Sequence, residues 1–290
     1  MNKKYINIKR GIIAAVLAMQ SIAAVSPVTA DSIEAAGLKQ FTDYAVDQGY
    51  GKLQGHWAEQ DIGVLYGRGG INGIPNEDGS VRFDANATIT TAQFLALILQ
   101  ASGNNNLDSA YDWAGGVLKK SSDLGIIGGA YISYDNNRNK PITREYAAFI
   151  LDRANDHIMK EPVVFPNQID VASKVLNDIG TATTNDTTFI GTTRDVVNMQ
   201  DYIGYVLAAG IMEGDNNGNF NPQSPMTRAE ATAVINRLFK YTPRIDTTNL
   251  KNNYGLEVWE SGVSPEIEAR NNSPEVQAGR EAARNKWTNR

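Results

Sequence analysis

Apolar residues recur at helical spacing in three places, each time after a short polar motif that contains threonine. The motifs are residues 89–93 (ITTAQ), 142–146 (ITREY) and 226–230 (MTRAE). After the first motif the apolar positions Phe94, Leu95 and Ile98 fall on one face of a helix, and the other two continue in the same way. The pattern therefore predicts three amphipathic helices, each introduced by its threonine.

A second apolar pattern precedes each motif and ends in a glycine turn, at 57–73, 113–129 and 198–214. It is typical of an amphipathic helix that glycine stops. We therefore expect a mainly α protein of three helix-loop-helix repeats, at 55–103, 104–160 and 161–242. The threonines are 53 and 84 residues apart (143 − 90 and 227 − 143). The longer third repeat contains an insertion, and we interpret its Thr- and Asn-rich stretch at 181–188 as a surface loop.

The two ends of the chain differ from the repeats. Residues 1–30 have a basic start, an apolar run and a small-residue cleavage pattern, which together predict a secretory signal peptide. The alternative, a membrane anchor, requires a longer apolar run. A lead-in at 31–54 includes a helical pattern at 33–46, and a polar tail covers 243–290. Within this tail, Ser273-Pro274-Glu275 predicts the start of a short terminal helix that ends near Trp287.

Composition excludes several kinds of chemistry. The chain of 290 residues has no cysteine and two histidines, so thiol catalysis, thiolate zinc sites, disulfides and a lipid-modified cysteine are excluded. We expect no metal and no cofactor. Signal removal takes away four basic and no acidic residues and changes the formal charge from −5 to −9. This acidity argues against nucleic acid as a partner. The mature chain has no stretch that predicts a membrane span.

These features together resemble the S-layer homology (SLH) family. The matching words are GHWA at 55–58, GIMEG at 210–214, GNFNP at 218–222 and MTRAE at 226–230, so the third repeat is closest to the family pattern. The resemblance covers about 55–241. It implies a pseudo-threefold helical prism with one repeat per prong. It also implies noncovalent binding to an anionic, often pyruvylated secondary cell wall polymer linked to peptidoglycan in Gram-positive-type envelopes. In that family the arginine of the Thr-Arg-Ala-Glu word contributes to grooves between repeats.

The threonine motifs have capping-box spacing. Thr90 with Gln93 and Thr227 with Glu230 can each cap a helix reciprocally, and this capping explains these residues without a ligand. Thr143 is expected to cap its helix as well, with half of the box lost because Tyr146 follows it.

The arginines need another explanation. Arg144 and Arg228 fall at the first helical position, where a cation is unfavourable and no acidic residue follows at helical spacing. One hypothesis is an anion site made of the guanidinium, free helix amides and the dipole. The alternative is an arginine bonded to a carboxylate of a neighbouring repeat. The first repeat has Thr91 instead, so one or two working grooves are expected.

Two tryptophans are further candidates for ligand binding. Trp57 and Trp113 start the first helices of two repeats, where they could stack on a sugar ring or pack in the core. His56 is interpreted as a local hydrogen-bond partner and His157 as a solvated side chain. Asp215, Asn217 and Asn219 resemble the start of an EF-hand loop, but the glycine and glutamate that such a loop requires are absent, which favours a polar turn.

The sequence thus favours a secreted, non-catalytic protein attached to the cell wall or S-layer through an anionic wall polymer. Two alternatives remain open. The first is an envelope glycan hydrolase, because the many acidic residues could include a catalytic pair. The second is a scaffold that recruits a protein partner through residues 250–290.

Overall fold

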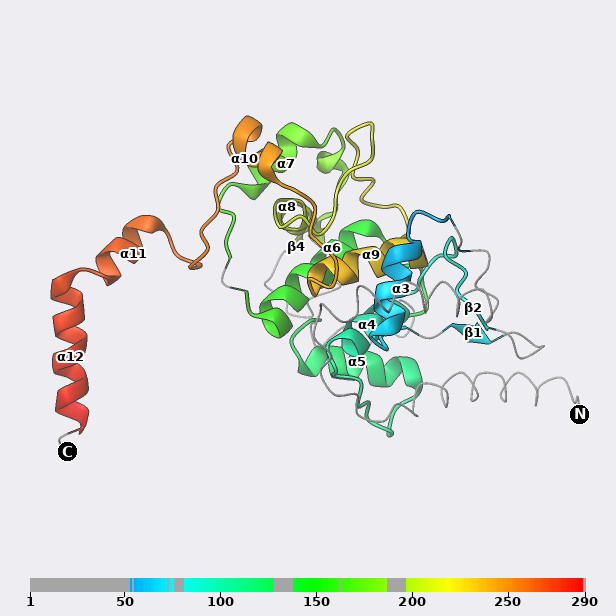
Figure 1. The fold of residues 1–290 in the computed structure, drawn as a ribbon, viewed down its shortest axis with the longest axis horizontal. Coiled ribbons are helices and arrows are strands. Elements are labelled where there is room, and N and C mark those ends of the chain that lie inside the picture. The colour runs from blue at the N-terminus through cyan, green and yellow to red at the C-terminus, as the bar shows by residue number, and fades with distance from the viewer. Residues whose placement is uncertain are drawn as a thin grey trace, which may run out of the picture.

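The structure is a computed structural model, and it is mainly helical (Figure 1). It describes residues 53–288, apart from 54, 72, 76–80, 128–137, 162 and 187–196. The signal peptide and the helix expected at 33–46 lie outside the described residues. The helices are α3 (Glu59–Gly67), α4 (Thr91–Ala101), α5 (Trp113–Asp123), α6 (Arg144–Ala154), α7 (Gln168–Val175), α8 (Met199–Ala208), α9 (Arg228–Leu238), α10 (Thr248–Tyr254), α11 (Pro265–Asn271) and α12 (Pro274–Thr288).

Two short antiparallel strand pairs accompany the α-helices, together with a π-helical turn (Asn155–Met159) and a 3-10 turn (Ile179–Thr181). Strand β1 (Ile74–Pro75) pairs with β2 (Val81–Arg82), and β3 (Thr184–Asp186) pairs with β4 (Val197–Asn198). The interpretation of 181–188 as a surface loop is therefore wrong for 184–186, which pair with the residues that lead into α8. Within the described part, no helix is long and apolar enough to cross a membrane.

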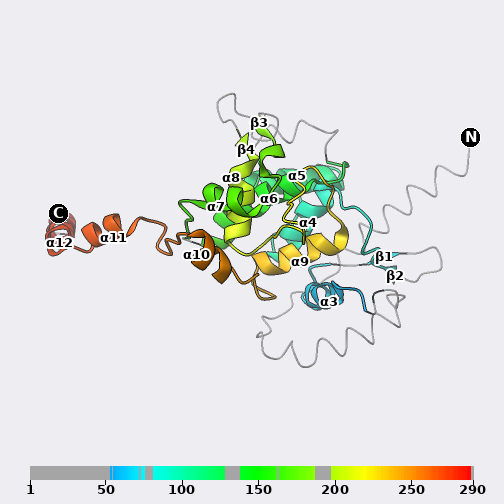
Figure 2. The same cartoon turned by 90° about the horizontal axis from the view of Figure 1, so that it is seen from above.

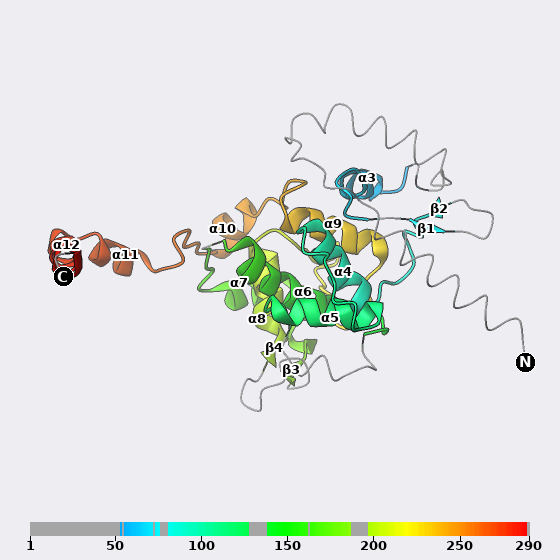
Figure 3. The same cartoon turned by 90° about the horizontal axis from the view of Figure 1, so that it is seen from below.

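The helices that follow the three threonines each pack against a helix from the next part of the chain. Helix α4 packs on α5, α6 packs on α8, and α9 returns to pack on α3. Figure 1 and Figure 3 both show α3, near the start of the described chain, beside α9. The packed faces are mainly apolar, with Ile62 of α3, Phe149 of α6 and Ile235 of α9 buried. This apolar burial is the main stabilising contribution to the body.

Backbone hydrogen bonds join the residues just before these threonines into a closed ring. The amide of Ile142 donates to the carbonyl of Ile89 at 3.0 Å, and the amide of Met226 donates to the carbonyl of Ile142 at 2.9 Å. The amide of Ile89 then donates to the carbonyl of Met226 at 3.0 Å. The three motifs therefore meet at one place, although they are far apart in the sequence.

The first two amides of each threonine-led helix are also bonded to the loop of a neighbour. Such amides have no partner within their own helix. Here they donate to loop carbonyls at 2.9–3.0 Å, as in the pairs Arg144 to Ser224, Glu145 to Pro222, Arg228 to Ala87 and Ala229 to Ala85. The expectation that free amides at Arg144 and Arg228 complete an anion site is therefore wrong, because neighbouring carbonyls already occupy those amides.

Side-chain caps form at two of the three threonines. Thr90 and Gln93 make a reciprocal capping box, and so do Thr227 and Glu230. The expectation that Thr143 caps its helix is wrong: its side chain makes no capping hydrogen bond. Its Oγ1 is buried without a hydrogen-bond partner among the described atoms. With Tyr146 at the third helical position, no side-chain oxygen is present to close the box.

This difference gives a stability prediction. Thr227→Ala should lower the free energy of unfolding by about 1 kcal/mol, because it removes a working helix cap. Thr143→Ala should cost less than about 0.5 kcal/mol, because its hydroxyl stabilises no helix amide. Equilibrium urea denaturation followed by circular dichroism measures both values. Equal losses in the two variants would contradict this assignment of the caps.

The insertion and the start of the tail extend the packed body. Helix α7 packs against α8, and α10 packs against α7. Val164 and Trp259 exchange two backbone hydrogen bonds of 3.1 and 2.9 Å, and Leu250 and Leu256 are buried. Beyond these contacts α11 and α12 extend away from the body (Figure 1 and Figure 2). Helix α12 begins at Pro274, at the predicted Ser-Pro-Glu start.

Candidate functional site

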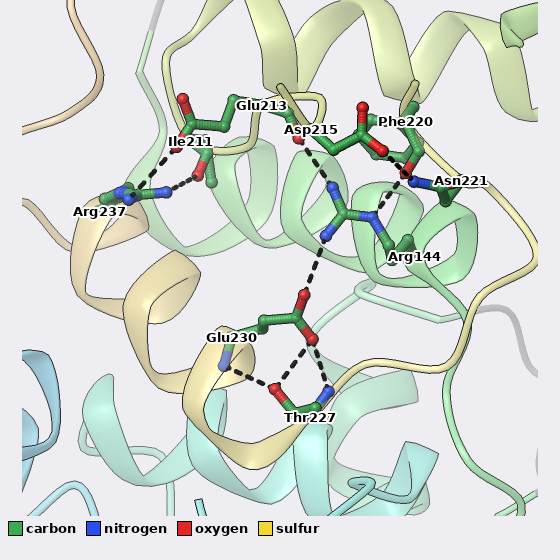
Figure 4. Close-up of polar contacts among 9 residues, drawn as sticks. All are labelled: Arg144, Ile211, Glu213, Asp215, Phe220, Asn221, Thr227, Glu230 and Arg237. Atoms are coloured by element: carbon green, nitrogen blue, oxygen red, sulfur yellow. Dashed lines mark hydrogen bonds and ion pairs between the residues drawn. The ribbon is translucent and has the colours of Figure 1, made fainter. Parts of the chain in front are cut away.

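A cavity of about 330 Å³ lies between the start of α6, the loop at 212–225 and α9. Its lining combines two arginines, Arg144 and Arg237, with the aromatic ring of Trp57 and several polar groups. Figure 4 shows the polar contacts around the two arginines. Each arginine comes from a different helix, so the cavity depends on the packing of parts of the chain that are distant in sequence.

Arg144 is held in place by three acceptors from the neighbouring loop and helix (Figure 4). Its Nε donates to the carbonyl of Phe220 at 2.7 Å and its Nη2 donates to the carbonyl of Glu213 at 2.8 Å. Its Nη1 lies 3.4 Å from Oε1 of Glu230, and its guanidinium lies over the Phe220 ring. Because a guanidinium has five N–H groups, two remain without a partner among the described residues.

Two opposing effects act on the charge of Arg144. Burial lowers the pKa of its guanidinium from the usual value, and the nearby carboxylate of Glu230 opposes this shift. An arginine stays protonated in proteins despite such a shift, because its pKa starts so high. The cavity therefore contains a fixed and partly desolvated positive charge, which is a strong partner for an anion.

Glu230 has two contacts that differ in strength. Its Oε2 accepts hydrogen bonds from the amide and the hydroxyl of Thr227 at 2.8 and 2.9 Å. Its Oε1 meets Arg144 only at 3.4 Å. The structure thus shows the alternative set out from the sequence, an arginine that pairs with a carboxylate from a neighbouring segment. That pairing is long, so a ligand acid could approach the guanidinium without disturbing the helix cap.

Arg228 has nearly the same pose on its own neighbour. Its Nε donates to the carbonyl of Phe83 at 2.7 Å, and its guanidinium lies 4.8 Å from the centre of the Phe83 ring. The corresponding distances at Arg144 are 2.7 and 4.7 Å. Arg228 does not line the described cavity. The loop at 76–80, which follows β1, lies outside the described residues.

The two tryptophans have different environments. Trp57 is 61% exposed and lines the cavity, so the core-packing alternative is wrong for it. It lies in the turn before α3, while Ala58 and Ile62 form the buried face. His56 holds this turn, because its Nδ1 accepts from the amide of Ala58 at 3.1 Å. Trp113, at the start of α5, packs half-buried on the core and does not line the described cavity.

The turn at 215–221 forms one wall of the cavity. Asp215 accepts hydrogen bonds from the amides of Asn217 and Asn219 and from the side chain of Asn221. The amide of Asn219 is the main reason that the pKa of Asp215 is lowered. This is the polar turn favoured over an EF-hand. Among the described residues, no three His, Cys, Asp or Glu side chains are grouped so that they could hold a metal ion.

A buried carboxylate beside Arg144 supports another wall. Glu145 is fully buried and accepts hydrogen bonds from the amide and hydroxyl of Thr183 and from the side chain of Gln223, all within 2.9 Å. These hydrogen bonds connect the insertion and the 222–225 loop to the start of α6.

The sequence did not single out Glu145 or Arg237 as site residues. The signal for Arg237 was a polar residue ten positions after each threonine, at Gln100, Arg153 and Arg237.

Comparison with known proteins identifies the segment that forms this wall. Residues 192–232 match the family model of the S-layer homology domain. These residues form a segment of the S-layer homology family. The matched SLH residues include α8, the turn at 215–221 and the start of α9, and thus much of the cavity lining. The SLH domain is a cell-wall-binding module.

Two curated relatives share part of the chain. A cell surface protein of Thermoanaerobacter kivui is 39% identical over 101 residues, which are 35% of this chain and 12% of that protein. An amylopullulanase of Thermoanaerobacterium thermosulfurigenes is 25% identical over 222 residues, which are 74% of this chain and 11% of that enzyme. The chain therefore matches only about a tenth of the length of each relative.

Proposed function

We propose that the chain attaches noncovalently to the cell wall by binding an anionic secondary cell wall polymer linked to peptidoglycan, and that it is not an enzyme. The observation that carries this proposal is the cavity beside Arg144, which combines a fixed positive charge with the exposed ring of Trp57. Its wall lies largely in the segment that matches the SLH family. A pyruvyl carboxylate or a phosphate would bind the two remaining N–H groups of Arg144.

The residues that line the cavity support a sugar as the part of the ligand that carries the acidic group. Trp57 presents an exposed ring at the cavity, and an aromatic face can cover the apolar face of a sugar ring. Asn221 and Ser224 line the cavity as well and add polar groups that fix the orientation of a ligand. A charged anchor, an apolar platform and a few polar groups together fit an acidic glycan.

The proposed architecture is a pseudo-threefold prism of three SLH repeats at 55–103, 104–160 and 161–242. The closed ring through Ile89, Ile142 and Met226 supports this arrangement. The cyclic packing of α4 on α5, α6 on α8 and α9 on α3 supports it as well. The similar poses of Arg144 and Arg228 indicate two related binding positions, of which the one at Arg144 has a described cavity.

The proposed location is the cell wall or S-layer of a Gram-positive-type envelope, after removal of a signal peptide at 1–30. The SLH match and the relative named a cell surface protein support this location. The amylopullulanase match covers 11% of that enzyme, so it gives no support for catalysis by this chain.

Cosedimentation with purified wall sacculi tests the proposed function. The mature chain should pellet with sacculi that retain their polymer and should stay in solution with sacculi from which the polymer has been stripped. Addition of free polymer should compete with binding, because both forms offer the same acidic groups. Equal pelleting with intact and stripped sacculi would refute polymer binding.

A further inference from the structure

Arg237 occupies a position that has a structural role elsewhere in the chain. It lies ten residues after the threonine that starts its helix, as do Gln100 in α4 and Arg153 in α6. The side chain of Gln100 donates to the carbonyl of Gly69 at 2.9 Å, and Arg153 donates to the carbonyl of Gly125 at 2.6 Å. In both places the side chain ties the helix to the glycine turn after the preceding helix.

Arg237 makes the corresponding tie only weakly. Its Nη1 lies 3.4 Å from the carbonyl of Ile211, and its Nη2 lies 3.9 Å from the carboxylate of Glu213. The Glu213 side chain is 58% exposed. A long hydrogen bond and an exposed ion pair contribute little stability. Gln100 and Arg153 both make this contact with a short hydrogen bond and Arg237 does not, so the contact alone does not account for the position of the Arg237 guanidinium.

The position of Arg237 suggests a different role. Arg237 and Arg144 line the same cavity, from α9 and α6 respectively. Figure 4 shows Glu213 between them: its main-chain carbonyl accepts from Arg144, and its carboxylate faces Arg237. By contrast, Gln100 and Arg153 do not line this cavity. Among these three positions, Arg237 alone combines long contacts to its own glycine turn with a place in the cavity lining.

We propose that Arg237 binds a second negative charge on the ligand, so that the cavity selects a wall glycan with two neighbouring acidic groups. This inference rests on the proposed function, in which Arg144 binds the first acid. The second acid would replace the exposed carboxylate of Glu213 as the partner of Arg237. The planar guanidinium accommodates a carboxylate or a phosphate, and either source supplies the required chemistry.

The test uses a substitution that the chain itself makes acceptable. Arg237→Gln introduces the residue that the chain has at the equivalent position in α4. There the side chain of Gln100 donates a hydrogen bond to the glycine turn. The fold should therefore persist, which thermal unfolding can check. Arg153→Gln is the matched control, because it removes an arginine at the same helical position but away from the cavity.

The probes are three synthetic N-acetylhexosamine disaccharides measured by calorimetry. The first has one acidic group, a pyruvyl ketal, and the others add a phosphate or a second carboxylate on the adjacent sugar. The unmodified protein should bind the better dianion at least about tenfold more tightly than the monoanion, because a charged hydrogen bond is gained. Arg237→Gln should abolish this preference, and Arg153→Gln should keep it. The better of the two dianions identifies the second group.

Each outcome distinguishes the inference from the function on which it rests. Equal affinity of the unmodified protein for all three glycans, or a preference that survives Arg237→Gln, would overturn the second-charge inference. If Arg144→Gln weakened binding of all three glycans in that case, the proposed function would still stand. Failure of the unmodified protein to bind either the glycans or intact sacculi would overturn both.

Discussion

Replacing Arg144 and Arg228 together with alanine is expected to abolish cosedimentation of residues 31–290 with wall sacculi. Each guanidinium is positioned by a loop carbonyl, at 2.7 Å in both cases, and Arg144 lines the described cavity. Loss of a charged hydrogen bond costs roughly 1.5–3 kcal/mol, so loss of two should weaken binding by at least about a hundredfold. The helical circular dichroism should stay unchanged, because apolar packing stabilises the helices.

Two further variants make this experiment specific. Arg144→Lys keeps a positive charge but loses the planar guanidinium, which can form two parallel hydrogen bonds with an acidic group. Its binding to sacculi should therefore be weaker than that of the unmodified protein and stronger than that of an alanine variant. Arg153→Gln removes a cation from the same helix without touching the described cavity, so binding should be unaffected. If the double variant binds sacculi as well as the unmodified protein does, the two arginines have no part in polymer binding.

Asp152→Asn is expected to stabilise the protein at neutral pH. Burial, assisted by the nearby charge of Asp156, raises the pKa of Asp152 to about 7. Asp152 lies nine residues after Thr143, and the residue at the same place after Thr227 is the buried Asn236. The chain therefore already uses an amide at this position of a threonine-led helix.

The sign of the pH dependence follows from this shift. The folded state binds the proton of Asp152 more tightly than the unfolded state, so stability falls as the pH rises from about 4 to about 7. The full shift corresponds to ~4 kcal/mol, and contact with solvent reduces it to roughly 2 kcal/mol. The asparagine variant should gain that amount above pH 7 and should match the unmodified protein below pH 4, as urea denaturation across this range measures. A constant difference at all pH values would contradict the assignment to Asp152.

Local sequence patterns predicted the helices that local chemistry specifies. The starts of α4 and α9 follow from their threonine motifs, because a cap and an apolar face lie within a few residues of each other. Helix α6 also starts directly after its threonine, although the side chain of Thr143 forms no cap. The start of α12 follows from Ser273-Pro274-Glu275 in the same way. Helices α7 and α10 were missed, because both are short and depend on packing against neighbouring helices rather than on a strong pattern of their own.

The site depended on contacts that no local pattern contains. Arg144 meets the carbonyl of Phe220, 76 residues further along the chain, and Arg228 meets that of Phe83, 145 residues earlier. The sequence singled out both arginines because they are unfavourable at a helix start, but it could not show that neighbouring carbonyls already occupy the helix amides. Trp57 was ambiguous for the same reason: its exposure depends on the turn of His56 and on the position of α9.

The ring that joins Ile89, Ile142 and Met226 has a consequence for the order in which the protein can fold. In a linear array each repeat contacts only its neighbours, so folding can begin at any repeat and spread from there. Here the amide of Arg228 donates to the carbonyl of Ala87, and the amide of Ala229 donates to the carbonyl of Ala85. The loop that contains Ala85 and Ala87 therefore lacks these hydrogen bonds until the start of α9 has been synthesised. Contacts of this sequence separation slow folding, because a long loop must close before they form. A nascent chain that ends before Met226 would therefore lack the closing contacts, and stable folding should begin only once the whole circle is present.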